Sequence, residues 1–169
     1  MAGDIVTFIN PGYSTLYVKD LPYTVGTGED PNLNPFQPSS SRPLIEGEWL
    51  QFGANYSFTR GGDNAVGSPG VPDNEGTVPS FIYFQERGRY DAQSTKMAHC
   101  VIGPAFFEFD TRLCVTAGLN VGDLVSVWDL DTFDGRIRRG LAAHSAGWAV
   151  GRVSRILGTN HIRVIYGLQ

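Results

Sequence analysis

The chain has 169 residues, of which 41% are apolar and 12% aromatic, so it is long enough to bury a core of its own. Its 21 glycines and 10 prolines, with only two lysines, are typical of turn-rich β proteins and disfavour a helical fold. The net charge of −4 excludes a generally basic nucleic-acid-binding protein, because neutralising phosphates requires a positive surface.

The charge is divided unevenly along the chain. Residues 1–76 carry three basic and nine acidic groups, a net charge of −6, whereas residues 77–169 carry ten and eight, a net charge of +2. Two interpretations stay open: a random distribution, and an asymmetry that orients the molecule on a charged partner.

The sequence also bears on cellular location. Its first residues lack the basic and apolar regions of a signal peptide. No run approaches the ~18 apolar residues of a membrane span, and two cysteines, Cys100 and Cys114, make no disulfide framework. We therefore expect synthesis in a reducing cytoplasm and no membrane association.

The N-terminal region predicts a β-hairpin. Residues 4–9 and 14–18 read as strands, and the turn residues Asn10, Pro11 and Gly12 lie between them.

A proline-rich arm follows, over residues 21–43. Five prolines in this span exclude a helix and a central strand. Long segments of this kind are either functional arms or plain exposed loops. As an arm, it would use Leu33 and Phe36 to contact a partner, and its deletion should leave the domain folded while weakening partner binding.

Residues 44–59 read as a strand with large aromatic side chains, and residues 60–77 as a loop. We place a domain boundary there. It separates residues 1–76, with the hairpin, the arm and the aromatic strands, from a β-barrel or β-sandwich domain of residues 77–169.

The second region is the denser in strand patterns. Strands are expected at residues 80–85, 97–102, 105–109, 121–130 and 162–166, and Gly158, Thr159 and Asn160 mark a hairpin turn. Short strands at this spacing predict an all-β fold, a small β-barrel or β-sandwich with a Pro/Gly-rich extended arm.

No residue pattern predicts a catalytic centre. Asp129, Asp131 and Asp134 could bind Ca²⁺, but they deviate from the EF-hand spacing, which favours a simple turn. The cysteines and histidines match no zinc motif. We therefore expect a protein that is not an enzyme and has no cofactor.

Arginines are the second group of candidate binding residues. They alternate in part along a strand, with two more upstream, and they read either as a solvated strand face or as a contact to an acidic protein surface. The residues are Arg87, Arg89, Arg136, Arg138 and Arg139.

Residues 78–169 resemble the decoration, or cement, proteins of tailed-phage capsids. The resemblance lies in FQERGRYDAQ (84–93), VIGPAFFEFDT (101–111), TAGLNVGDLVSV (116–127), RRGLAAH (138–144) and AVGRVSRILGTNHIRVIYG (149–167). It implies a β-rich virion protein on the capsid exterior that bridges neighbouring subunits of the major capsid protein as a homo-oligomer, a dimer or trimer. It implies no catalytic residue, no cofactor and no direct contact with nucleic acid.

Two other functions stay open. One is a neck or tail structural protein of a phage with a similar barrel. The other is a carbohydrate- or receptor-binding β domain, in which an exposed Trp49, Trp128 or Trp148 beside an aspartate would form a sugar platform, unless these tryptophans belong to the core.

Overall fold

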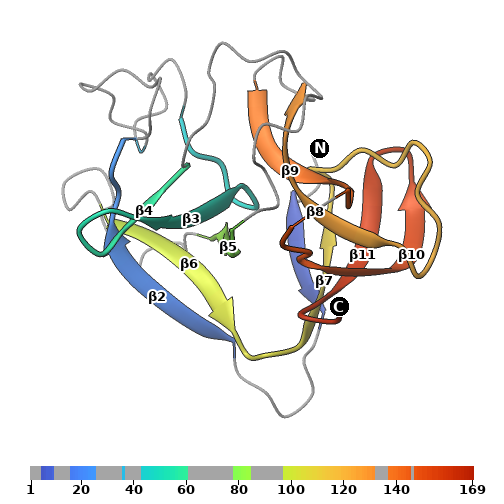
Figure 1. Cartoon of the computed structure of the whole chain (residues 1–169), viewed down its shortest axis with the longest axis horizontal. Helices are drawn as coiled ribbons and strands as arrows, with labels where there is room; N and C mark the ends of the chain where they lie inside the picture. The colour runs from blue at the N-terminus through green and yellow to red at the C-terminus, as the bar shows by residue number, and fades with distance from the viewer. Residues whose placement is uncertain are drawn as a thin grey trace.

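The computed structural model describes residues 5–9, 16–25, 36, 43–60, 78–84, 97–131, 137–145 and 147–169. These residues form eleven strands and no helix, in two sheets that lie side by side (Figure 1). The strands are β1 (Val6–Ile9), β2 (Tyr17–Pro22), β3 (Trp49–Gly53), β4 (Ser57–Thr59), β5 (Ser80–Tyr83), β6 (Met97–Gly103), β7 (Phe107–Thr111), β8 (Leu124–Asp131), β9 (Ile137–Ala143), β10 (Gly151–Gly158) and β11 (His161–Tyr166). The predicted all-β fold class is therefore confirmed.

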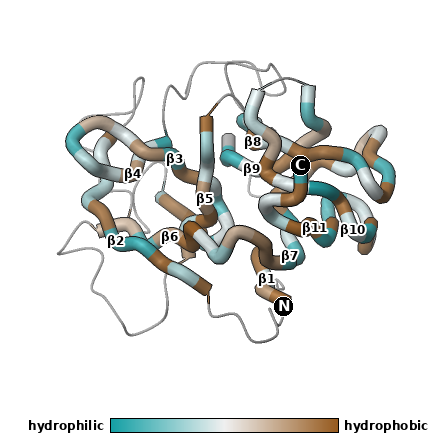
Figure 2. Tube along the Cα trace, turned by 60° about the horizontal axis from the view of Figure 1, so that its bottom comes forward, coloured by the Kyte–Doolittle hydropathy of each residue, from teal (hydrophilic) through white to brown (hydrophobic). Residues whose placement is uncertain are grey.

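The first sheet, called sheet A, has the order β1-β7-β11-β10-β8-β9. Two of its antiparallel pairs, β8–β9 and β10–β11, join strands that are consecutive in the chain. The predicted turn at residues 158–160 connects β10 to β11, and Asn160 has the positive φ of 49° that such a turn needs. Buried and half-buried residues alternate along β11, as expected for a strand with one face toward the core. Hydrophobic and hydrophilic positions follow one another along β10 and β11 in Figure 2.

Sheet A curls, so that the segment after its inner strand β7 reaches its edge strand β9. The segment that follows β7 pairs with β9, because Leu141 N–H donates to the Leu113 carbonyl at 2.9 Å and Val115 N–H donates to the Leu141 carbonyl at 2.8 Å. Gly140 permits this approach, since a Cβ there would collide with the Leu113 carbonyl oxygen. The close contact explains why a glycine interrupts β9.

The second sheet, sheet B, has the order β2-β6-β5-β3-β4 and also curls on itself. Its edge strands β2 and β4 approach each other at their ends. There, Thr24 N–H donates to the Phe58 carbonyl at 2.8 Å, and Tyr23 and Phe58 form an isolated parallel bridge. Pro22 lies at the end of an edge strand, where its missing N–H costs no ladder hydrogen bond.

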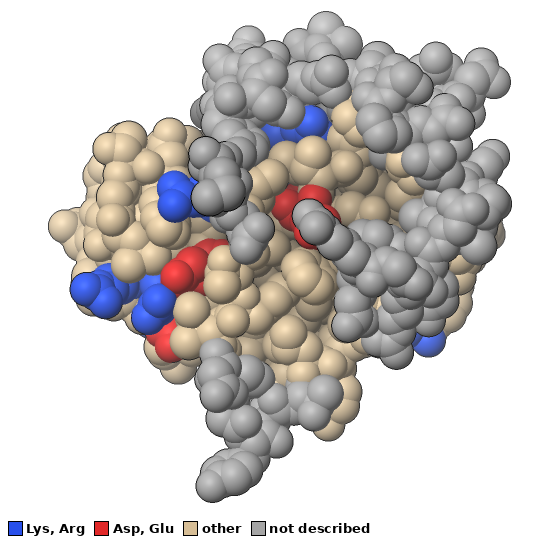
Figure 3. All heavy atoms as spheres, turned by 180° about the vertical axis from the view of Figure 1, so that it is seen from behind, with Lys and Arg blue, Asp and Glu red and all other residues tan. Residues whose placement is uncertain are grey.

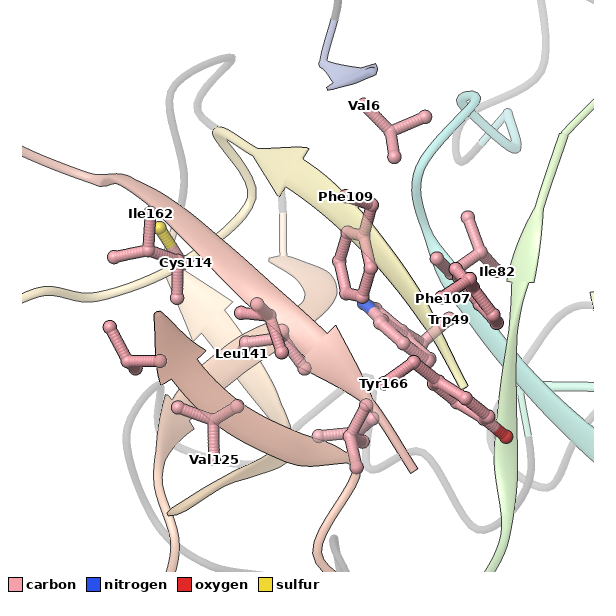
Figure 4. Close-up of a cluster of buried hydrophobic side chains, with 14 of the residues drawn as sticks. Val6, Trp49, Ile82, Phe107, Phe109, Cys114, Val125, Leu141, Ile162 and Tyr166 are labelled. Atoms are coloured by element: carbon pink, nitrogen blue, oxygen red, sulfur yellow. The ribbon is translucent and has the colours of Figure 1, made fainter. Parts of the chain in front are cut away.

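The largest core lies between the sheets, and Trp49 of sheet B occupies its centre (Figure 4). The Trp49 ring is fully buried, 5.8 Å from the Phe109 ring and stacked 6.4 Å from the Tyr166 ring, both of sheet A. Ile82 and Val101 of sheet B join the same cluster. Because side chains of both sheets share this core, the described residues fold as one packed unit.

A second core fills the concave side of sheet B, where Leu50, Phe58 and Cys100 are fully buried. Phe36 packs against it, with its ring 6.1 Å from that of Tyr23 and 6.4 Å from that of Tyr83. Strand β3 therefore contributes to both cores, with Trp49 on one face and Leu50 on the other.

The predicted N-terminal hairpin is wrong, because β1 pairs with β7 in sheet A while β2 pairs with β6 in sheet B. Residues 44–59, which were predicted to be strand, contain two paired strands, β3 and β4. Sheet B takes strands from both sides of residue 76, since β5 and β6 belong with β2, β3 and β4.

Candidate binding surface

Buried ionic groups connect the two sheets. The Glu48 carboxylate is fully buried and accepts hydrogen bonds from Arg60, Nε at 3.1 Å and Nη2 at 3.2 Å. Arg138 of β9 lies 3.5 Å from the same carboxylate and donates to the Pro43 carbonyl, and Arg139 donates to the Arg60 carbonyl. These contacts join β9 of sheet A to the segments that flank β3 and β4.

The burial of Arg138 and Arg139 corrects the interpretation of the arginines as a surface patch. Only 1% and 2% of these two residues is exposed, so neither a solvated strand face nor a partner contact describes them. They extend into the interior because Glu48 and backbone carbonyls compensate their charge there. Arg87, Arg89 and Arg136 lie outside the described residues.

The described residues of the proline-rich arm correct the expectation that it can be deleted without loss to the fold. Leu21 is buried in β2, and Phe36 is half-buried and packs against the second core, that of its own sheet B. A deletion of residues 21–43 would therefore remove core side chains. Leu33 lies outside the described residues.

The aspartates and cysteines considered as candidate metal ligands do not form a site among the described residues. Asp129 is buried, the side chain of Asp131 is not described, and Asp134 lies outside the described residues. Cys100 and Cys114 belong to different cores. Burial raises the pKa of Cys114 to about 12 and that of Cys100 well above its usual range, so both thiols are protonated at neutral pH. Within the described ranges, no group of three His, Cys, Asp or Glu residues is placed to hold a metal ion.

Two exposed aromatic side chains stand out on the β3–β4 hairpin. Phe52 is 51% exposed, and Tyr56 in the connecting turn is 67% exposed. The Phe52 ring rests on two buried rings, stacked 5.5 Å from Phe58 and tilted 4.9 Å from Phe81. The Lys19 ammonium of β2 lies 5.3 Å above the Tyr56 ring, a cation–π geometry. We call Lys19, Phe52 and Tyr56 the aromatic tip.

The backbone of the aromatic tip is strained. Asn55 and Tyr56 have φ values of 57° and 56°, in the left-handed region that asparagine tolerates and tyrosine rarely adopts. A glycine at position 56 would avoid a cost of about 1–2 kcal/mol. The turn therefore holds a large exposed ring where a small residue would be more stable.

The sequence reasoning missed the aromatic tip because it treated residues 44–59 as one strand. The sequence signal for this turn was Asn55, a residue type that favours turns, which lies between Phe52 of β3 and Phe58 of β4. Of the three tryptophans considered for a sugar platform, Trp49 is fully buried, which excludes it. Trp128 and Trp148 are half-buried, and Trp148 packs against the core between the sheets.

Comparison of the chain with protein-family models, with curated proteins and with solved structures found no match. In the part of the chain that the structure describes, no helix has the length and apolar character needed to cross a membrane.

Proposed function

We propose that this chain is a structural virion protein, a decoration protein that binds the outer surface of an assembled phage capsid and cements neighbouring subunits of the major capsid protein. The proposal begins from the resemblance of residues 78–169 to such proteins. A stable β scaffold with exposed contact residues suits this work, because many modest contacts repeated over a symmetric shell sum to strong attachment.

The aromatic tip is the single observation that carries the proposal. Phe52 and Tyr56 are large, exposed and fixed on a rigid hairpin, and aromatic residues of this kind dominate the energetics of protein interfaces. Phe52 is supported from below by Phe58 and Phe81, and the Tyr56 ring lies under the Lys19 ammonium, so little side-chain entropy is lost when a partner covers the two rings.

Co-sedimentation with assembled shells of the phage that encodes this chain tests the proposal. The wild-type protein should sediment in a fixed ratio to the shell subunit, and the Phe52→Ala/Tyr56→Ala variant should bind roughly tenfold or more weakly. Val121→Ala is the matched control, since Val121 is also an exposed apolar residue but lies in a turn of sheet A. A wild-type protein that stays in the supernatant would refute the proposal.

The same aromatic tip gives a reason to test one alternative, a carbohydrate-binding β domain. Exposed tyrosine rings can stack on sugar faces, although the fully buried Trp49 cannot contribute. A glycan array probed with wild type and the double variant separates the two functions, because only a sugar site would give signals that the variant loses. Light scattering on the isolated protein tests the expected dimer or trimer.

A further inference from the structure

The outer face of sheet A carries a concentration of charge that the aromatic tip does not include. In β7 and β11 alternate residues are buried, so the intervening residues point outward, and the register sets Arg152 and Arg155 of β10 opposite outward residues of β11. These outward residues, together with Arg112 directly after β7, include four arginines and two carboxylates. They are Glu108, Asp110, Arg112, Arg152, Arg155 and Arg163, which we call the arginine face.

One ion pair accounts for part of this charge. Arg163 binds Asp110 in a bidentate arrangement, Nε to Oδ1 at 2.6 Å and Nη2 to Oδ2 at 3.0 Å, and this contact raises the pKa of Arg163. Glu108 accepts a hydrogen bond from Ser154 Oγ at 2.8 Å. Arg112 and Arg155, in contrast, are exposed, so the face has an excess of positive charge in a chain whose net charge is −4.

The arrangement of the arginines has a cost for the fold. Arg155 lies directly opposite Arg163 in the β10–β11 register, and like charges at opposite positions destabilise a sheet. The bidentate contact of Arg163 with Asp110 offsets part of this repulsion, so the exposed positive charge of the opposed arginines lies chiefly at Arg155. The positive charge also affects His161. Burial of the His161 ring is the largest cause of its lowered pKa, and the neighbouring Arg112 is the second.

Figure 3 shows basic and acidic side chains close together on the half of the molecule that sheet A forms. Asp110 is paired with Arg163 and Glu108 accepts from Ser154. The exposed Arg112 and Arg155 therefore leave the face with a positive excess that is complementary to an acidic partner. The net charge of −4 disfavours nucleic acid as that partner. Half-buried Ile165 lies between Arg152 and Glu108 in the register, which adds an apolar contact to the face. Arginine among apolar residues is the composition of protein interfaces.

We infer that the arginine face is a second docking surface, and that it binds an acidic surface of the capsid shell subunit. This inference rests on the proposed function and extends it, since a protein with contacts on both sheets can bridge two shell subunits. The charge complementarity would speed association and align the molecule before the aromatic tip engages.

The test is co-sedimentation with shells at 50 and 300 mM NaCl, using wild type, Arg112→Glu/Arg155→Glu and Arg112→Lys/Arg155→Lys. Both substituted side chains are exposed, so all three proteins should fold, and the glutamate variant should be no less stable than wild type because it removes the like-charge pair of Arg155 and Arg163. We expect the glutamate variant to bind about tenfold or more weakly at 50 mM NaCl, the lysine variant to bind nearly as well as wild type, and the difference to shrink at 300 mM NaCl.

The outcomes separate the two proposals. If wild type binds and the glutamate variant binds equally well, the arginine face is refuted while the cement function stands. If wild type does not bind, both are refuted. Duplex DNA serves as a second probe. If wild type binds DNA and the glutamate variant does not, the partner of the arginine face is nucleic acid and the acidic protein partner is refuted.

Discussion

The two sheets differ in what they bury and in what they expose. Sheet A has an apolar interior and carries charged side chains on its outside. Sheet B is flanked by a buried carboxylate with buried arginines and exposes aromatic rings at one hairpin. Both sheets combine strands that are consecutive in the chain with strands that are distant in it, so the comparison teaches that the difference lies in side-chain chemistry and not in how local the strand pairing is.

Removing the charge of Glu48 should have the largest effect on stability. Glu48→Gln leaves the buried guanidinium groups of Arg60 and Arg138 without their carboxylate, which should cost about 3–5 kcal/mol in the free energy of unfolding. Urea unfolding of the purified protein measures this. Asp123→Asn, at a half-buried carboxylate in a turn of sheet A, is the control, and a loss below about 1 kcal/mol for Glu48→Gln would show that the buried pair contributes little.

The closure of sheet A can be broken at Gly140. A Cβ at this position would meet the Leu113 carbonyl oxygen and the Leu130 side chain, so Gly140→Ala should destabilise the protein by about 1–3 kcal/mol. The control is Gly158→Ala, since Gly158 has open space around its Cβ position. Equal effects of the two substitutions in thermal unfolding would contradict the role of Gly140 in closing the sheet.

Alkaline pH should weaken the core between the sheets. Burial raises the pKa of Tyr166 to about 12, so the folded state keeps a proton that the unfolded chain releases from about pH 10. The contribution of Tyr166 to the free energy of unfolding is fully present below pH 10. It falls by at most about 1.4 kcal/mol per pH unit between pH 10 and pH 12. Tyr166→Phe should reduce the loss of stability between pH 10 and 11, measured by urea unfolding, and an unchanged loss would assign the effect to other groups.

The smallest effect concerns the strained turn of sheet B. Tyr56→Gly removes the left-handed tyrosine and also its contact with Lys19, so stability should stay the same or rise by up to about 1 kcal/mol. Binding to shells should weaken in the same variant. Asn55→Gly is the control, because asparagine already tolerates its φ. A variant that loses stability would show that Tyr56 serves the fold.

The strands of sheet A could be predicted because their signals are local. Alternation along residues 162–166 and turn residues at 158–160 identify a hairpin without knowledge of any distant contact. Strand β1 was also recognised, but its partner β7 lies in the second half of the chain, and a hydrophobic pattern carries no information about pairing partners.

The candidate sites were harder to predict for a physical reason. An arginine in a strand pattern predicts exposure, and only the fold reveals that Glu48 compensates the charge of Arg138 inside the protein. Conversely, an aromatic residue predicts burial, and the exposure of Phe52 follows from its place near the end of a strand. Charge alone therefore assigned Arg138 and Arg139 to the wrong environment, and hydropathy alone did not identify Phe52 as exposed.

The position of β7 between β1 and β11 has a mechanical consequence. Both neighbours run antiparallel to β7, so β1 and β11 are parallel to each other. A tension applied between the start of β1 and the end of β11 would load the two ladders in shear, so that all their hydrogen bonds resist together. An unzipping force would break the same bonds one at a time. A protein anchored through these strands would therefore behave as a stiff tie under load along this direction.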